Sequence, residues 1–223
     1  PLPMRHGLTM GELALLFNHH YGIHCELEVI AMEGYTRRML FRDTGLTWIP
    51  PSPNMPSPDT AMVYPGQVLL EGTGLSEGRG TTRPFELFGA PFIDPFMIKE
   101  KTDQRGLPGV TLREAYFQPT FNKWRGLLCG GLQLHVTDPC RFKPYATTLA
   151  LLQDVKALYP GQFSWADPPY EYETVKRPLD IIAGDRGIRE ALEQQRPIDE
   201  LESSWQADIQ AFKHLARNYH LYH

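Results

Sequence analysis

Residues 71–86 read EGTGLSEGRGTTRPFE, and the interpretation of the whole chain depends on this stretch. It holds four glycines, with acidic and basic side chains and threonines between them. Glycine lets the backbone turn tightly and approach a ligand closely, at an entropic cost to folding. The apolar run at 68–70 predicts the end of a buried strand. Glu71 then follows that strand, at the position where open α/β sheets place ligand-binding residues.

The residues of this stretch allow three interpretations. A solvated surface turn explains the charges without any ligand. Phosphate binding fits poorly, because Glu77 replaces the last glycine of G-x-G-x-x-G and no Gly-Lys-Ser/Thr ending of a P-loop is present. A sugar or a carboxylate-bearing ligand suits the mixture of donors, acceptors and the forked guanidinium of Arg79.

The composition excludes several classes of protein. The 223 residues can bury a real core, and 22 basic against 26 acidic residues give a net charge of -4. No basic footprint for nucleic acid is present, and no apolar run approaches a membrane-spanning length. Three cysteines without C-x-x-C spacing favour neither a zinc site nor a disulfide framework. A cluster of histidines at 19–24 is better explained as a helix end, so we expect no metal and no cofactor.

The first half of the chain predicts a helix, a strand and a loop. Thr9 and Glu12 form a capping box that begins a helix, and Gly22 is expected to end it. Residues 25–29 alternate as a half-buried strand does. Residues 47–66 are rich in proline, which predicts a loop throughout. Asn54 in that loop either lines a pocket or belongs to a stiff belt across the domain.

The second half alternates between both kinds of element. We predict strands over 110–117 and 131–137, with Gln133 and His135 on one face of the latter, pointing either into a cleft or into solvent. Apolar spacing predicts helices over 94–104, 144–158, 185–195 and 198–215. Strands and helices mixed in this way favour α/β or mixed α+β packing.

Several motifs together carry a resemblance to a known family. They are RHGLT (5–9), PPSPNMP (50–56), YPG (64–66), EGT through PFE (71–86), GAPFID (89–94) and the strand at 131–138. In this order they resemble the exo-β-N-acetylmuramidase family NamZ, along essentially the whole chain. The resemblance implies a bacterial enzyme that removes terminal N-acetylmuramic acid from the non-reducing end of peptidoglycan fragments, and it favours a secreted or periplasmic location.

One departure from the family bears on the domain organisation. Family members begin with a Rossmann-like domain that supplies a catalytic glutamate in a Glu-His-Gly setting, and no such triplet occurs here. The chain begins at Pro1 rather than Met, as an excised or processed piece would. We therefore expect residues 1–223 to be the C-terminal auxiliary domain, with 1–46 belonging to the domain junction. Its expected partner is the Rossmann-like N-terminal domain, against which it would form one wall of a cleft.

The resemblance also suggests roles for individual residues. Glycoside hydrolysis uses two carboxyl groups around the scissile bond, and Glu71 and Glu77 are the candidates from this chain. Arg79 is the candidate for the lactyl carboxylate of muramic acid. Candidates for contacts to hydroxyl and acetamide groups are Thr81, Thr82, Asn54, Gln133 and His135. Two alternatives stay open, a non-catalytic module that binds muropeptides and a structural cap on the other half.

Overall fold

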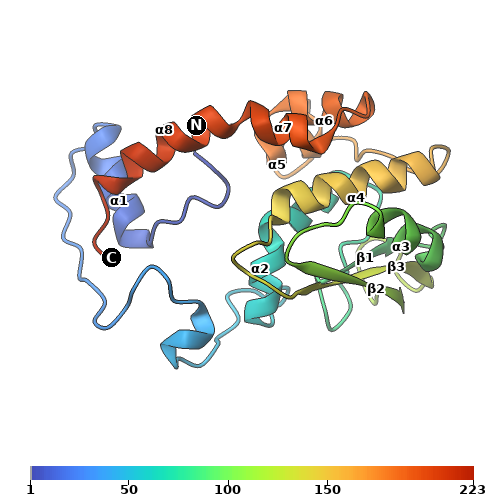
Figure 1. Ribbon diagram of the computed structural model, residues 1–223, viewed down its shortest axis with the longest axis horizontal. Helices are drawn as coiled ribbons and strands as arrows, with labels where there is room; N and C mark the ends of the chain where they lie inside the picture. Colours follow the sequence, from blue (N-terminus) through green and yellow to red (C-terminus); the bar gives the residue numbers. More distant parts are fainter. Residues whose placement is uncertain (1) are drawn as a thin grey trace. The chain divides into compact units, whose positions relative to one another are not determined.

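The computed structural model describes residues 2–223, which form two compact units (Figure 1). One unit comprises the residues up to Thr47 together with Glu202–His223, and the other comprises Trp48–Leu201. The larger unit combines helices with a three-stranded sheet. The mixed α+β class predicted from the sequence is therefore confirmed. No helix within residues 2–223 has the length and apolar character needed to cross a membrane.

The sheet is antiparallel throughout, with the strand order β1-β3-β2. Its strands are β1 (Leu87–Ala90), β2 (Val110–Phe117) and β3 (Cys129–Val136). The structure confirms the strands predicted at 110–117 and 131–137, although the latter, β3, begins two residues and ends one residue earlier than expected. Gly131 lies at the centre of the sheet, where an added Cβ would come within 1.9 Å of the Phe88 carbonyl oxygen. Only glycine allows the two backbones to approach this closely.

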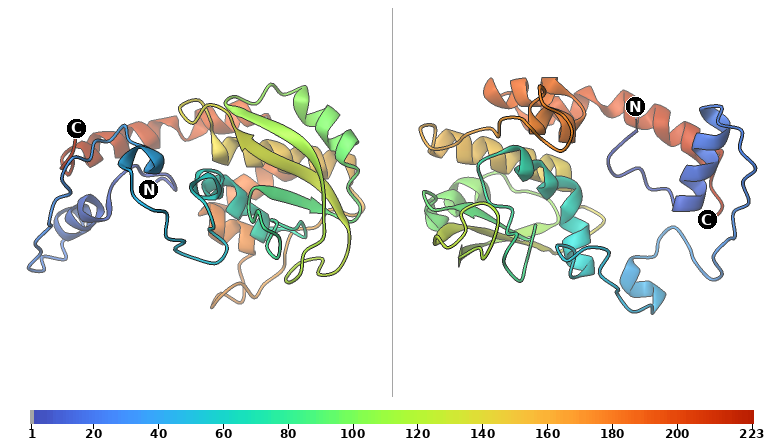
Figure 2. Two further views of the ribbon diagram at one scale, coloured as in Figure 1. Left: turned by 90° about the horizontal axis from the view of Figure 1, so that it is seen from below. Right: turned by 180° about the vertical axis from the view of Figure 1, so that it is seen from behind.

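Three helices pack beside the sheet, and one of them contacts the other two. They are α2 (Pro58–Gln67), α3 (Pro95–Asp103) and α4 (Pro144–Leu158). Both α2 and α3 contact strand β3 and also pack against α4, which lies beside the sheet (Figures 1 and 2). The predicted helices at 94–104 and 144–158 are confirmed. Because α4 is buried on nearly every side, it forms the centre of this unit's core.

Helix α2 corrects two predictions. The proline-rich loop expected over 47–66 ends at Ser57, whose hydroxyl accepts from the Thr60 backbone N–H, while Pro58 takes the first helical position. Proline is favoured there because that N–H has no partner inside a helix. The expected strand at 68–70 is instead the 3-10 helix η2 (Val68–Gly72). A short run of buried apolar residues does not distinguish a strand from a buried helix.

The C-terminal part of the larger unit packs against η2. Helix α5 (Pro178–Ala183) contacts both η2 and α6 (Arg186–Glu193). A Cβ added to Gly72 would lie 2.6 Å from the Leu179 Cα, so glycine is needed where α5 meets η2. Helix α6, capped by the Asp185 side chain, confirms the helix predicted at 185–195 with slightly shorter bounds.

The long helix predicted over 198–215 is wrong, because two helices occupy this stretch. They are α7 (Ile198–Ser204) and α8 (Gln206–Arg217), and Trp205 separates them. Two serines precede the break. Serine lowers helix propensity because its hydroxyl competes for backbone hydrogen bonds. The apolar spacing that predicted one helix is therefore shared by two successive ones.

In the smaller unit, α1 (Met10–His20) packs against α8. Leu16 is buried against Phe212 and Ala216, and Figure 2 shows the two helices beside each other. A single turn of 3-10 helix, η1 (Phe41–Thr44), lies near the end of the first segment. The strand predicted over 25–29 is wrong, since residues 25–29 form irregular chain.

The Glu12 side chain holds the smaller unit together. The predicted capping box is confirmed, with Glu12 Oε2 accepting from the Thr9 backbone N–H at 2.8 Å. Arg37 donates to both carboxylate oxygens, and the Leu221 backbone N–H donates to Oε1 at 2.8 Å. Burial alone would raise the pKa of Glu12, but these hydrogen bonds and the Arg37 charge outweigh it and lower the pKa below 4.5. The carboxylate thus joins both ends of the chain.

Candidate functional site

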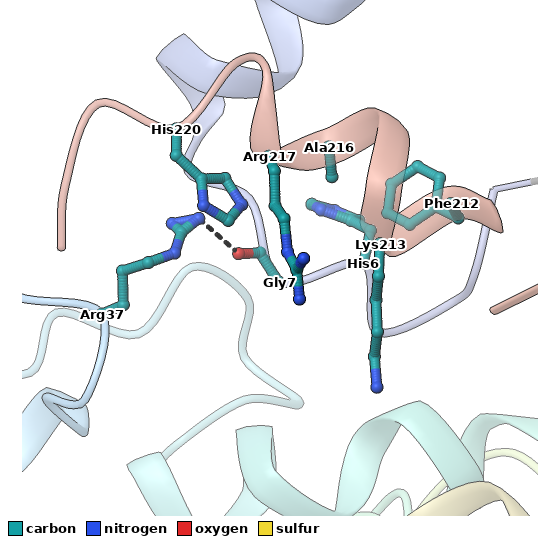
Figure 3. A pocket seen from close by; sticks show the side chains of 8 residues that line it. All are labelled: His6, Gly7, Arg37, Phe212, Lys213, Ala216, Arg217 and His220. Atoms are coloured by element: carbon teal, nitrogen blue, oxygen red, sulfur yellow. Dashed lines mark hydrogen bonds between the residues drawn. The ribbon is translucent and has the colours of Figure 1, made fainter. Parts of the chain in front are cut away.

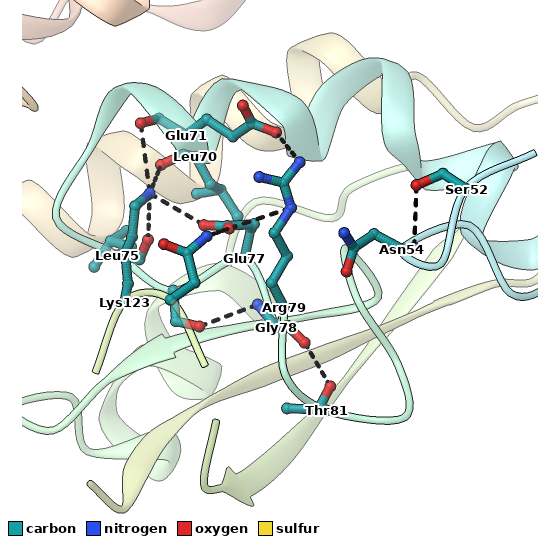
Figure 4. Close-up of polar contacts among 12 residues, drawn as sticks. Ser52, Asn54, Leu70, Glu71, Leu75, Glu77, Gly78, Arg79, Thr81 and Lys123 are labelled. Atoms are coloured by element: carbon teal, nitrogen blue, oxygen red, sulfur yellow. Dashed lines mark hydrogen bonds and ion pairs between the residues drawn. The ribbon is translucent and has the colours of Figure 1, made fainter. Parts of the chain in front are cut away.

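The candidate site lies in the larger unit, where the glycine-rich stretch follows η2 (Figure 4). Glu71 is on η2, and its side chain is 12% exposed. One carboxylate oxygen accepts from Arg79 Nη2 at 2.7 Å, and the other accepts from the Tyr170 hydroxyl at 2.8 Å. Both oxygens of Glu71 are therefore held by protein donors.

Glu77 is the second carboxylate of the site and is almost completely buried, with 1% of its side chain exposed. Oε2 accepts from Lys123 Nζ at 3.0 Å, and Oε1 accepts from Asn122 Nδ2 at 3.4 Å. Arg79 Nε lies 3.7 Å from Oε1, within ion-pair range. A buried carboxylate needs such partners, because burial removes its hydration.

Arg79 lies between the two carboxylates. Its guanidinium carbon is 5.2 Å from the centre of the Phe85 ring, within the range of a cation–π contact. The Tyr64 ring packs edge-on against the same phenylalanine, at 4.8 Å between centres. Within residues 2–223, Arg79 makes one hydrogen bond, to Glu71, and its Nε is buried without a hydrogen-bond partner. The guanidinium therefore keeps unused donors.

Lys123 was not assigned a role by the sequence, although it fixes the geometry of this stretch. Its ammonium donates to the carbonyl oxygens of Leu70 at 2.9 Å and Leu75 at 3.1 Å, and to Glu77 at 3.0 Å. The Glu71 carbonyl oxygen lies at 3.4 Å. Burial lowers the pKa of Lys123, and the neighbouring Glu77 carboxylate opposes part of that shift. One cation thus ties the end of η2 to the buried carboxylate.

Tyr170 is the other group that the sequence did not reveal. Burial and its hydrogen bond to Glu71 raise the pKa of the phenol well above its usual value, so the hydroxyl stays a donor. Together, Glu71, Glu77, Arg79 and Lys123 contribute two negative and two positive charges. The cluster is therefore neutral as a whole, with aromatic rings beside it.

The other predicted residues of the 54–82 region differ in their contacts. The Thr81 hydroxyl donates to the Gly78 carbonyl oxygen at 2.6 Å, so it stabilises the loop itself. Thr82 is exposed at the surface. Asn54 is half-buried, and its amide points toward the Arg79 side chain in Figure 4. The structure thus brings Glu71, Glu77 and Arg79 together and leaves Asn54 at the edge of the group.

The two candidates on β3 lie apart from this hydrogen-bonded group. Gln133 is buried, and its Oε1 accepts from Arg113 Nη2 at 2.5 Å on the neighbouring strand. His135 is exposed two residues further along. In the part of the chain that the structure describes, no polar contact joins either side chain to Glu71, Glu77 or Arg79.

Glu86, at the end of the glycine-rich stretch, has its polar contacts with residues other than Arg79. It accepts from the Thr60 hydroxyl at 2.7 Å and from Arg83 at 3.3 Å. This side chain therefore anchors the start of α2 to the end of the glycine-rich stretch.

Carboxylates, a guanidinium and aromatic rings in one cluster are the groups with which proteins bind sugars and carboxylate-bearing ligands. Comparison with known proteins agrees with a sugar as the class of ligand. Residues 62–222 match the family model described as exo-beta-N-acetylmuramidase NamZ, C-terminal, and residues 1–59 match the N-terminal model of the same family. The chain belongs to the exo-β-N-acetylmuramidase NamZ family.

Individual relatives support the assignment. The chain is similar to the peptidoglycan β-N-acetylmuramidase NamZ of Bacillus subtilis, with 41% identity over 222 residues, which cover 100% of this chain and 52% of that protein. Two crystal structures of DUF1343 family proteins from Bacteroides fragilis are also similar. Their TM-scores are 0.84 at 30% identity and 0.68 at 26% identity, each covering 97% of this chain and 56% of the other. The chain thus spans about half the length of these relatives.

Proposed function

We propose that this chain is part of a glycoside hydrolase that removes terminal N-acetylmuramic acid from the non-reducing end of peptidoglycan fragments. The observation that carries the proposal is the similarity of the whole chain to about half of the Bacillus subtilis peptidoglycan β-N-acetylmuramidase. The convergence of Glu71, Glu77 and Arg79 adds support, because glycosidases work with carboxyl groups. The larger unit would form one wall of the substrate cleft.

The two carboxylates suit different roles in this proposal. Glu71 is the more accessible, and each carboxylate oxygen has two acceptor sites, so it can still accept from a sugar hydroxyl. Glu77 is buried among Lys123, Asn122 and Arg79, which suits a positioning role. We therefore propose Glu71 as the carboxyl group that contacts substrate.

Arg79 is the proposed ligand of the lactyl carboxylate. Its unused N–H groups can bind a carboxylate in bidentate fashion, and Glu71 holds the guanidinium in place. Contacts to hydroxyl and acetamide groups are proposed for Asn54, Thr81, Thr82, Gln133 and His135. Of these, Asn54 has the most direct support, since its amide points toward Arg79.

The proposed partner is the rest of the N-terminal, Rossmann-like half of the family. Residues 1–59 match the N-terminal family model, and the smaller unit carries apolar side chains without cover. Ile30 is 89% exposed and Leu46 is 69% exposed. Residues 25–29 have the alternation of a strand but no neighbouring strand within residues 2–223. A sheet contributed by the partner would supply both the cover and the missing hydrogen bonds.

The test of this partnership is turnover of a chromogenic N-acetylmuraminide. We expect the chain alone to have little or no activity, and the chain joined to the N-terminal half of a family member to be active. Family-level turnover by residues 1–223 alone would contradict the shared site.

The roles of the carboxylates can be separated kinetically in the joined enzyme. If Glu71 transfers a proton, Glu71→Gln should lower kcat on the order of a hundredfold or more. A binding role should mainly raise KM. The matched variant Glu77→Gln should lower thermal stability, because it weakens the contact with Lys123. Wild-type kinetics for both variants would remove these carboxylates from the site.

The role of Arg79 can be separated by substrate. Arg79→Lys keeps the charge but loses the paired geometry, so we expect transition-state binding to weaken by about 1.5–3 kcal/mol on the muraminide. The loss should nearly vanish on an N-acetylglucosaminide, which lacks the lactyl group. Equal losses in kcat/KM on both sugars, with a lower melting temperature, would instead show that Arg79 holds Glu71 and Glu77 in shape.

A non-catalytic sugar-binding module is the second candidate function. The observation in its favour is that every oxygen of Glu71 and Glu77 already faces a protein donor, which suits binding more than proton transfer. Saturable binding of N-acetylmuramic acid by the chain, without any turnover in the joined enzyme, would favour this candidate.

A further inference from the structure

The smaller unit contains a cavity of about 260 Å³ that is separate from the site described above (Figure 3). Its walls are the N-terminal segment at His6 and Gly7, the segment at Arg37, and helix α8 with the residues that follow it. The volume is slightly below that of pockets for drug-sized ligands, so it suits a compact ligand.

The charged side chains that line this cavity are all basic. Its lining includes the basic side chains of Arg37, Lys213 and Arg217 and no acidic side chain. Arg37 is neutralised by the buried Glu12, to which it donates at 3.0–3.1 Å. Within residues 2–223, neither Lys213 nor Arg217 has an ion pair. The cavity therefore keeps two uncompensated positive charges in a chain whose net charge is -4.

These two charges lie one turn apart on α8. Like charges at i and i+4 repel and destabilise a helix, and a bound anion would relieve that repulsion. In Figure 3 both side chains extend in the same direction from the helix. Arg217 also lies in the last helical turn, where a cation interacts favourably with the helix dipole. Lys213 lies a full turn earlier, so the dipole does not account for the pair.

The remaining walls add hydrogen-bond donors and an apolar surface. His6 Nδ1 accepts from the Leu8 backbone N–H at 3.1 Å, which places the proton of the neutral imidazole on Nε2. His220 lines the cavity near Arg37. Burial and the nearby positive charge of Arg37 lower the pKa of His220, as expected in a positive field. Phe212 contributes a buried aromatic wall.

We propose that this cavity is a binding site for a small organic oxyanion, with Lys213 and Arg217 as its charged ligands. A carboxylate or a phosphate group meets the two cations, since a guanidinium can bind either in bidentate fashion. The carbon skeleton of the ligand lies against Phe212. The proposal concerns binding in the smaller unit and does not depend on hydrolysis.

The test is a titration of the whole chain at an ionic strength held constant with chloride. The probes are inorganic phosphate, N-acetylmuramic acid as the carboxylate, and N-acetylglucosamine as the matched sugar without a carboxylate. Calorimetry gives the affinity, and the ring C–H resonances of His6 and His220 in NMR spectra report whether the ligand enters this cavity. We expect at least one anion to bind saturably and to shift these resonances. N-acetylglucosamine should neither bind in this cavity nor shift them. Phosphate alone or muramic acid alone would identify the chemical source of the oxyanion.

The variants connect the binding to the two cations. Lys213→Gln combined with Arg217→Gln should weaken the affinity about tenfold or more, because one hydrogen bond to a charged group contributes about that factor. Lys101→Gln, at an exposed position on α3, should leave it unchanged. The His6 and His220 resonances, which report on this cavity, separate its occupation from any binding at the proposed lactyl site. The proposal is overturned if neither anion shifts the imidazole resonances, or if the double variant binds as tightly as Lys101→Gln.

Discussion

Replacing Lys123 by methionine tests whether one buried cation holds the candidate site together. Methionine keeps most of the side-chain volume and removes the charge. The change deletes hydrogen bonds to the carbonyl oxygens of Leu70 and Leu75 and leaves the buried Glu77 without its nearest cation. Of the original partners of Glu77, Asn122 at 3.4 Å and Arg79 at 3.7 Å remain.

The size of the effect follows from these contacts. Removing one partner of a fully buried ion pair costs about 3–5 kcal/mol. Lys123 is 24% exposed, and Arg79 still faces Glu77, so we expect a smaller loss of about 2–4 kcal/mol in the free energy of unfolding. For a unit of this size the melting temperature should fall by about 5–15 °C.

The assay is denaturant unfolding followed by tryptophan fluorescence, since Trp124 donates to the Gly74 carbonyl oxygen beside the site. Lys101→Met, on the exposed surface of α3, is the matched control and should change stability little. A double variant that also carries Glu77→Gln should lose less than the sum of the two single losses, because both act on one pair. A loss below about 1 kcal/mol for Lys123→Met, or additive losses within about 0.5 kcal/mol, would refute the reasoning.

Two further predictions concern packing and acid stability. Gly66→Ala should destabilise the larger unit by about 1–3 kcal/mol, because the added Cβ would lie 2.0 Å from the Pro144 carbonyl oxygen. The control Gly161→Ala places its Cβ where no atom lies within 4 Å, so it should change the free energy of unfolding little in the same assay. The pKa of Glu12 is lower in the folded chain than in the unfolded chain. At acidic pH the unfolded chain therefore binds more protons, and the free energy of unfolding should decrease as the pH drops below about 4.5. Glu12→Gln should lower stability at neutral pH and flatten that acid-side dependence, and an unchanged pH profile of unfolding would show that Glu12 does not contribute.

Several elements could be predicted because their signals are local. The capping box at Thr9 and Glu12, strand β2 and helix α4 each depend on residues a few positions apart. Each of these signals is carried by residues close together in the sequence, so the sequence alone was sufficient. The same holds for the mixed α+β class, which follows from the order of strands and helices.

The wrong predictions fall where local signals are ambiguous. Residues 68–70 are apolar and buried in either a strand or a helix, and only their packing beside α2 and α5 selects η2. Residues 25–29 alternate as a strand does, but a strand needs a neighbour to satisfy its backbone. Without one in the described residues, this segment is irregular chain.

For the candidate site, the sequence by itself identified the stretch at 71–86 and its charged residues. The glycines and charged residues of this stretch lie close together in the sequence, so they can be recognised without the structure. The tertiary structure alone decided which groups hold those charges. Lys123 is 52 residues from Glu71, and Tyr170 is 99 residues from it. A contact at that separation leaves no periodic or spacing signal in the sequence. It arises only when the sheet, α5 and the 165–177 loop pack together and a buried carboxylate takes the nearest available donors.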